Sequence, residues 1–162
     1  KANKAAKLDP KAMALYMAMA ENVLNTGDSA KAMIRRVKVD KDIPIEDVIE
    51  SLNAVAEENN LLVVANSLMS GGKKGGKYIR IISYCNPHIA KKFINHSMAF
   101  IAFMPCRMGI VEDDNGDIWI YTMDLGLMIA GGHTLPPKLL KMAKSVETAM
   151  YSMMDKAAKG EF

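Results

Sequence analysis

The residues best suited to chemistry in this sequence are its two cysteines, Cys85 and Cys106. Cys85 ends one predicted strand and Cys106 begins another, so a sheet could bring the two thiols together although they are far apart in the sequence. Three interpretations stay open: both are small buried hydrophobic side chains, both form a disulfide or reversible dithiol, or both bind a metal, haem or sulfur ligand. Arg107 follows Cys106, and its positive charge could lower the pKa of that thiol or pair with an anion.

Histidines and methionines near the cysteines could complete a soft ligand set. Thiolates and thioethers favour cuprous copper, and methionine can be an axial ligand of haem, so copper and haem are the candidate cofactors. The candidate ligand-binding residues are Cys85, Cys106, Arg107 and His96, and the candidate metal ligands are Cys85, Cys106, Met104, Met108 and His88. The sequence has no Cys-X-X-Cys-His motif and no four-ligand zinc pattern, and most of its 14 methionines fit flexible packing.

Acidic residues surround a strong hairpin signal. Asn115-Gly116 lies between two alternating apolar segments, and these two residues are expected to supply the positive φ angles of a tight turn. The carboxylates around this turn belong to Glu112, Asp113, Asp114 and Asp117. We expect them to stay hydrated at the turn rather than to act as a glycosidase pair. No serine-histidine-aspartate order or dinucleotide fingerprint accompanies them, and the glycine-rich segment 70–76 is expected to be a linker.

Length and charge limit the classes of function. A chain of 162 residues suits one domain, and its net charge of +3, without a concentrated basic stripe, argues against nucleic-acid binding. No uncharged apolar run reaches the roughly 18 to 20 residues of a membrane-spanning helix. The sequence begins at Lys1 without an initiator methionine, and we expect that a signal peptide or membrane tether was removed. The expected location is therefore the periplasm or cell envelope.

Hydrophobic periodicity predicts a mixture of helices and strands. Helices are expected at about 10–25, 44–59, 87–95, 124–129 and 137–156, and strands at about 30–39, 61–65, 78–84 and on both sides of a hairpin over 107–122. The apolar run Leu61 to Ala65 is interpreted as a buried strand. This order predicts an α+β fold in which a mostly antiparallel sheet packs with helices. We expect residues 1–29 to form a tether and an amphipathic helix, and residues 30–158 to form a single domain.

Three segments of the sequence resemble the bacterial and archaeal family called domain of unknown function 302. They are Ile81 to Pro87, Phe103 to Asp113, and Asp117 to Asp124 followed by Leu135-Pro136-Pro137, and the resemblance spans about residues 30 to 155. The resemblance implies a compact α+β domain around an antiparallel sheet, often dimeric, with no established reaction. The commoner family form has glycine before Asn-Pro and leucine after the later proline, whereas this chain has Cys85 and Cys106 at those positions.

The sequence therefore leads to one main hypothesis and two alternatives about function. The main hypothesis is a self-associating envelope or periplasmic domain that binds a soft metal, haem or small redox ligand near Cys85 and Cys106. The alternatives are a dithiol redox protein and a purely structural oligomeric interaction module with packed cysteines. A homodimer is the expected assembly, an envelope protein is a further candidate partner, and no nucleic-acid partner is expected.

Overall fold

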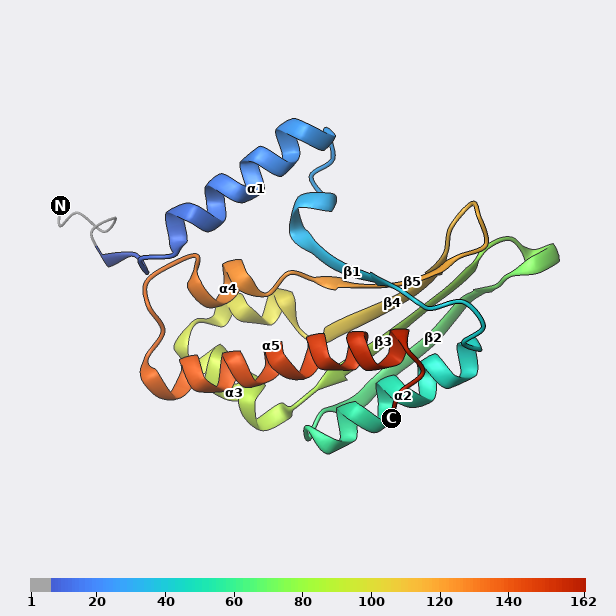
Figure 1. The fold of residues 1–162 in the computed structure, drawn as a ribbon. Helices are drawn as coiled ribbons and strands as arrows, with labels where there is room; N and C mark the ends of the chain where they lie inside the picture. The colour runs from blue at the N-terminus through green and yellow to red at the C-terminus, as the bar shows by residue number, and fades with distance from the viewer. Residues whose placement is uncertain (1–6) are drawn as a thin grey trace. The chain divides into compact units, whose positions relative to one another are not determined.

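The computed structural model describes residues 7–162 and has an α+β fold (Figure 1). Its helices are α1 (Ala12–Thr26), α2 (Ile45–Glu58), α3 (Pro87–His96), α4 (Gly126–Ala130) and α5 (Pro137–Ala158), and its strands are β1 (Ile34–Lys38), β2 (Leu62–Gly71), β3 (Tyr78–Cys85), β4 (Cys106–Glu112) and β5 (Ile118–Met123). Short 3-10 helices also occur, among them η2 (Lys31–Met33), η3 (Lys73–Gly75) and η4 (Met98–Phe103). The predicted fold class, including the N-terminal helix, is confirmed.

Two compact units make up the chain. The first contains Lys1–Arg35, described from Lys7 onward, and Met123–Glu147, and the second contains Arg36–Thr122 and Thr148–Phe162. Helix α5 therefore begins in the first unit and ends in the second. The predicted division into residues 1–29 and 30–158 stays a prediction.

The sheet has the strand order β1-β5-β4-β3-β2, which places β1 and β2 at its edges. Strand β2 pairs antiparallel with β3, β3 with β4, and β4 with β5. The register sets Ile82 opposite Met108 on β3 and β4, and Ile110 opposite Ile120 on β4 and β5. These side chains are fully buried, and since residues that are directly paired project to the same face, they define the core face of the sheet.

Helix α2 and the end of α5 supply the apolar residues of this core. The buried helical side chains are Val48, Leu52 and Val55 on α2, and Met150, Met153, Met154 and Ala157 on α5. Tyr84 projects from β3 on the core face, and its hydroxyl donates a hydrogen bond of 2.8 Å to Oδ1 of Asn53 on α2. Burial raises the pKa of Tyr84 far above its usual value. The backbone N–H of Asp40, just after β1, donates to the carbonyl of Ala158 at the end of α5.

Local sequence signals explain where α2 and α3 begin. Pro44 has an extended conformation and precedes α2, whose first turn carries the acidic residues Glu46 and Asp47. Negative charge near the N-terminus of a helix is stabilising, because it interacts favourably with the positive end of the helix dipole. At α3, the side chain of Asn86 accepts a hydrogen bond of 3.1 Å from the backbone N–H of Ile89, and Pro87 occupies the first turn. Both features are favourable at a helix N-terminus.

The first unit is held together by hydrogen bonds between α1 and the segment after α4. Helix α1 ends at Thr26, and the next residue, Gly27, has a φ of 67° and donates its N–H to the carbonyl of Val23. The hydroxyl of Tyr16 on α1 donates to the carbonyl of Gly131 at 2.8 Å. Just before α1, the backbone N–H of Asp9 donates to the carbonyl of Gly132 at 2.8 Å. The N-terminal helix and the residue that precedes it are therefore attached to the segment after α4 by polar contacts.

Strand β2 differs from its prediction as a short buried strand. Leu61 is buried, but β2 runs from Leu62 to Gly71 and is exposed along almost all of its length. The prediction was wrong because an apolar run has the same appearance in a central strand and in an edge strand, and only the strand order places β2 at the edge. After β2, the glycine-rich segment forms η3 and leads directly into β3.

Candidate functional site

The sheet brings the two cysteines onto neighbouring strands but not into direct register. Cys106, at the start of β4, lies opposite Tyr84, and Cys85 is the next residue along β3. Successive residues of a strand project to opposite faces, so this register favours the core face for Cys106 and the other face for Cys85. Both cysteines are free thiols, and both are half-buried. The two cysteines therefore lie on neighbouring strands without a disulfide between them, and a joint role for them stays a prediction.

Burial dominates the electrostatics of both thiols. It raises the pKa of Cys85 above its usual value. For Cys106, burial again raises the pKa most, the neighbouring Cys85 raises it further, and Arg107 lowers it only in part. The positive charge of Arg107 therefore acts in the direction that the sequence suggested, but burial outweighs it and the pKa of Cys106 is raised. A thiol with a raised pKa is protonated near neutral pH and is a poor nucleophile.

We expect iodoacetamide to modify Cys106 slowly in the folded, reduced protein. At neutral pH its rate should be about tenfold or more below that of the same thiol in the urea-unfolded chain, and it should increase as the pH rises above about 8.5. Mass spectrometry of timed samples measures the rate, with Cys85→Ala used to isolate Cys106. Rapid, pH-independent alkylation of folded Cys106 would instead show a stabilised thiolate and support the dithiol hypothesis.

The other predicted ligands lie in different environments. Met108 is fully buried on the core face of β4, opposite Ile82. His88 and His96 are exposed on α3, and the His96 ring lies 6.5 Å from that of Phe100. Met104 is half-buried before β4. Within residues 7–162, no group of three or more His, Cys, Asp or Glu side chains is arranged to hold a metal ion. A ligand set built from thiols and thioethers stays a prediction.

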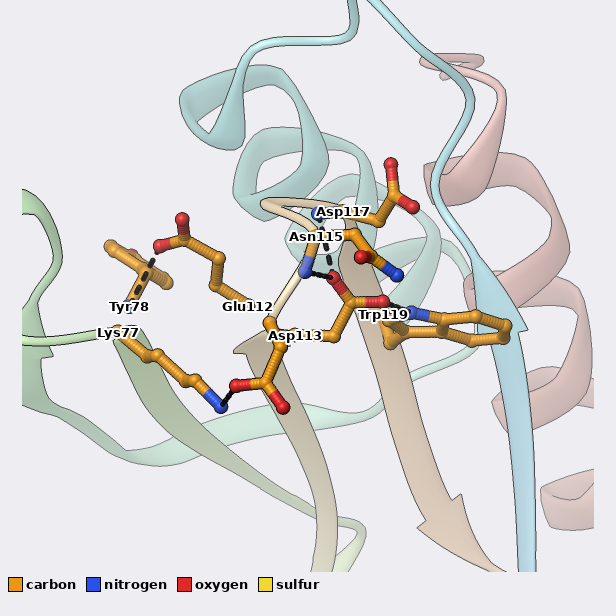
Figure 2. Close-up of polar contacts among 8 residues, drawn as sticks. Lys77, Tyr78, Glu112, Asp113, Asn115, Asp117 and Trp119 are labelled. Carbon is orange, nitrogen blue, oxygen red and sulfur yellow. Dashed lines mark hydrogen bonds and ion pairs between the residues drawn. The ribbon is translucent and has the colours of Figure 1, made fainter.

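The β4–β5 hairpin contains a carboxylate that accepts three hydrogen bonds, that of Asp113 (Figure 2). Its Oδ1 accepts hydrogen bonds of 2.9 Å from the backbone N–H groups of Asn115 and Asp117. Its Oδ2 accepts a third bond of 2.9 Å from Nε1 of Trp119. These bonds, with that from Trp119 the largest cause, lower the pKa of Asp113. The sequence predicted only that this carboxylate stays hydrated, and the structure adds that it organises the turn through these three hydrogen bonds.

The turn itself is looser than the predicted two-residue turn. Strand β4 ends at Glu112 and β5 begins at Ile118, so the connection runs from Asp113 to Asp117. Gly116 has a φ of 79° and donates its N–H to the carbonyl of Asp113. Asn115 is not among the residues with positive φ, so glycine alone supplies the left-handed conformation. The longer loop gives the Asp113 side chain room to accept backbone N–H groups.

Ion pairs surround this hairpin on both sides. Lys38 Nζ lies 2.9 Å from Asp117 Oδ2, and that contact raises the pKa of Lys38. Lys77 pairs in the same way with Asp114 (Figure 2). The guanidinium of Arg36 lies 4.4 Å from the centre of the Trp119 ring, a cation–π distance. Since these charges have partners within the hairpin region, the cluster accounts for the shape of the hairpin without requiring a ligand.

We expect Asp113→Asn to destabilise the protein, because an amide NH2 group would replace one of the two accepting oxygens and face an N–H donor. A fall in Tm of about 2–4 °C is expected at neutral pH. The folded pKa of Asp113 is lowered, so its stabilisation is present above the unfolded pKa and is lost as the pH falls. The Asp113→Asn variant should therefore lose less stability than the wild-type protein when the pH is lowered into the acidic range. Asp114→Asn, at an exposed carboxylate, is the control and should lose stability with falling pH as the wild-type protein does.

Strand β2 presents the clearest unpartnered surface of the second unit. Its exposed large side chains are Leu62 (57%), Val63 (45%), Val64 (51%), Leu68 (52%) and Met69 (64%). The strand contains no charged residue from Leu62 to Gly71. Sequence reasoning missed this surface, although the absence of any charge over the strand was a visible signal. An exposed, uncharged edge strand has backbone N–H and C=O groups available for pairing with another strand.

No helix in the part of the chain that the structure describes has both the length and the apolar character needed to cross a membrane.

Comparisons with known proteins agree on one family. The family model for "Domain of unknown function DUF302" matches residues 35–157. A similar solved structure is the crystal structure of an uncharacterized conserved DUF302 protein from Bacillus stearothermophilus, with a TM-score of 0.60 and 18% sequence identity. The similarity covers 77% of this chain and 98% of that one, and at this identity it supports the fold alone. Comparison with curated proteins found no match.

Proposed function

We propose, starting from the fact that the chain belongs to the domain of unknown function DUF302 family, that it is a non-catalytic domain that self-associates through strand β2. The observation that carries this proposal is the exposed, uncharged edge of the sheet from Leu62 to Gly71. Proteins that remain monomeric protect such edges with lysine, proline, β-bulges or a covering segment. Strand β2 has neither lysine nor proline, and between two register shifts its pairing is regular from Ala65 to Leu68, so a second strand is the simplest cover for this stretch.

The thiols support the structural interpretation of the cysteines within this proposal. Both thiols are half-buried, and their pKa values are raised rather than lowered. Catalytic and redox cysteines usually have lowered pKa values in electropositive surroundings. Cys85 and Cys106 are therefore assigned to packing at the β3–β4 junction, and the chain acts as an interaction module. Its location in the periplasm or cell envelope stays part of the proposal.

The assembly is tested by measuring molar mass in solution. Sedimentation equilibrium of the full chain should show a dimer below about 100 μM, and Leu68→Lys should raise its Kd by about tenfold or more, because lysine on an edge strand opposes pairing. Met98→Lys introduces the same charge at an exposed methionine of η4 and should leave the dimer intact. A wild-type chain that stays monomeric throughout this range would contradict the proposal.

A ligand near the cysteines is the second candidate, because the register places Cys85 and Cys106 on adjacent strands. Copper and haem remain the ligands to test. Native mass spectrometry of protein prepared without reductant or chelator should show the polypeptide mass alone if the cysteines are packed. A copurifying mass that is lost in the Cys85→Ala, Cys106→Val variant would favour the ligand hypothesis instead.

A further inference from the structure

Strand β2 has opposite charges at its two ends. Glu57 and Glu58 are exposed at the end of α2, a few residues before β2 begins. Lys73 and Lys74 are exposed on η3, just after β2 ends. The strand between them carries no charge. The strand is therefore an uncharged, largely apolar segment with an acidic end and a basic end. Beside its middle, Nη1 of Arg80 on β3 donates a hydrogen bond of 2.6 Å to Oδ1 of Asn66.

These charges cannot neutralise one another within a single chain. Ten residues of strand span about 33 Å, which is several times the Debye length of about 8 Å at physiological ionic strength. Within residues 7–162, none of Glu57, Glu58, Lys73 and Lys74 has a salt bridge. Their charges are thus available to a partner that lies along the edge.

A second copy of the chain has the complementary arrangement. Two identical edge strands related by a two-fold axis perpendicular to the sheet run antiparallel, as the strands of this sheet already do in its β2–β3, β3–β4 and β4–β5 pairs. Antiparallel pairing brings the acidic end of one strand beside the basic end of the other, and the two-fold axis repeats this at both ends. A parallel arrangement would set like charges together.

The regular part of β2 indicates where the two-fold axis lies. The pairing of β2 with β3 shifts between Val63 and Ala65 and again between Leu68 and Ser70. Between these two irregularities the strand is continuously paired from Ala65 to Leu68. Asn66 and Ser67 occupy the middle of that segment and also the middle of β2. The small, uncharged side chain of Ser67, which projects to the face opposite that of Asn66, allows two copies to approach at this position.

Building on the proposed function, we infer that two copies of the chain join antiparallel along β2, with the two-fold axis at Ser67, so that this residue lies directly opposite the partner subunit's Ser67. The two sheets then form one continuous sheet. Glu57 and Glu58 face the partner subunit's Lys73 and the partner subunit's Lys74 at each end. The apolar side chains of β2 pack in the middle, and the charges at the ends select this polarity of pairing.

Charge exchange tests this arrangement directly. The double variant Glu57→Lys, Glu58→Lys and the double variant Lys73→Glu, Lys74→Glu should each raise the dimer Kd by about tenfold at low salt, because each places like charges together. The quadruple variant restores opposite charges and should return the Kd to within about threefold of the wild-type value. Lys91→Glu, Lys92→Glu changes two exposed lysines of α3 and is the matched control.

A cross-link provides the second readout. Ser67→Cys in a Cys85→Ala, Cys106→Val background should form a symmetric disulfide-linked dimer on mild oxidation, whereas Met98→Cys in the same background should not. Circular dichroism of each variant checks that the chain is folded. If the wild-type chain is a dimer but the charge exchanges do not change its Kd, or Ser67→Cys does not cross-link, this pairing is wrong and self-association is still supported. A monomeric wild-type chain overturns both.

Discussion

Replacing Met108 with alanine should lower the free energy of unfolding by about 2–5 kcal/mol, because the side chain is fully buried and alanine leaves a cavity. Met108 lies on the core face of β4, opposite Ile82. Its thioether therefore lies among core side chains, where unbranched sulfur-containing side chains fill irregular gaps. Urea denaturation of the purified variant, followed by circular dichroism, measures the change.

Met108→Leu separates packing from metal binding. Leucine keeps the apolar volume and removes the sulfur, so a packing role predicts a loss below about 1.5 kcal/mol. Met98→Ala, at an exposed site of η4, is the surface control and should change stability little. If Met108→Leu destabilised the protein as much as Met108→Ala and also released bound copper, the packing interpretation would be wrong.

Replacing Gly131 with alanine should destabilise the first unit by about 1–3 kcal/mol, because there is no space for a Cβ atom. Gly131 follows α4 and donates its N–H to the carbonyl of Leu127 at 2.7 Å. A Cβ at Gly131 would collide with that carbonyl oxygen, a backbone atom, so the chain itself would have to shift. Such a shift would also disturb the hydrogen bond of 2.8 Å from the Tyr16 hydroxyl to the Gly131 carbonyl.

The adjacent glycine provides a matched control for this substitution. A Cβ at Gly132 would meet no atom within 4 Å, and Gly132 does not have a positive φ. Gly132→Ala should therefore be close to neutral or slightly stabilising, since alanine restricts the unfolded chain. Thermal denaturation of the two variants under the same conditions makes the comparison. Equal denaturation midpoints for Gly131→Ala and Gly132→Ala would show that the backbone after α4 can shift to accept a Cβ atom without loss of stability.

The apolar side chains of the core face and those of β2 differ in their exposure to solvent. On the core face, methionine and isoleucine side chains are covered by the chain itself. Along β2, side chains of similar hydrophobicity remain in contact with solvent in the single chain. A large apolar surface that stays exposed often marks a place where another molecule binds.

Several elements could be predicted from the sequence because short-range interactions determine them. The Asn86-Pro87 pair predicted the start of α3, where the Asn86 side chain caps the backbone N–H of Ile89. The hairpin was equally visible, since Gly116 supplies a conformation that most residues avoid. The family resemblance was also carried by local motifs, and the matched family model confirms it.

The tertiary structure decided which predicted elements and side chains meet, because this depends on strand order and register. The apolar run that begins β2 has the composition of a buried strand, yet the order β1-β5-β4-β3-β2 leaves it at an edge. Cys85 and Cys106 lie on adjacent strands, but a register offset of one residue favours opposite faces for them. Neither fact is encoded in any short stretch of sequence, since each depends on which distant segment supplies the neighbouring strand.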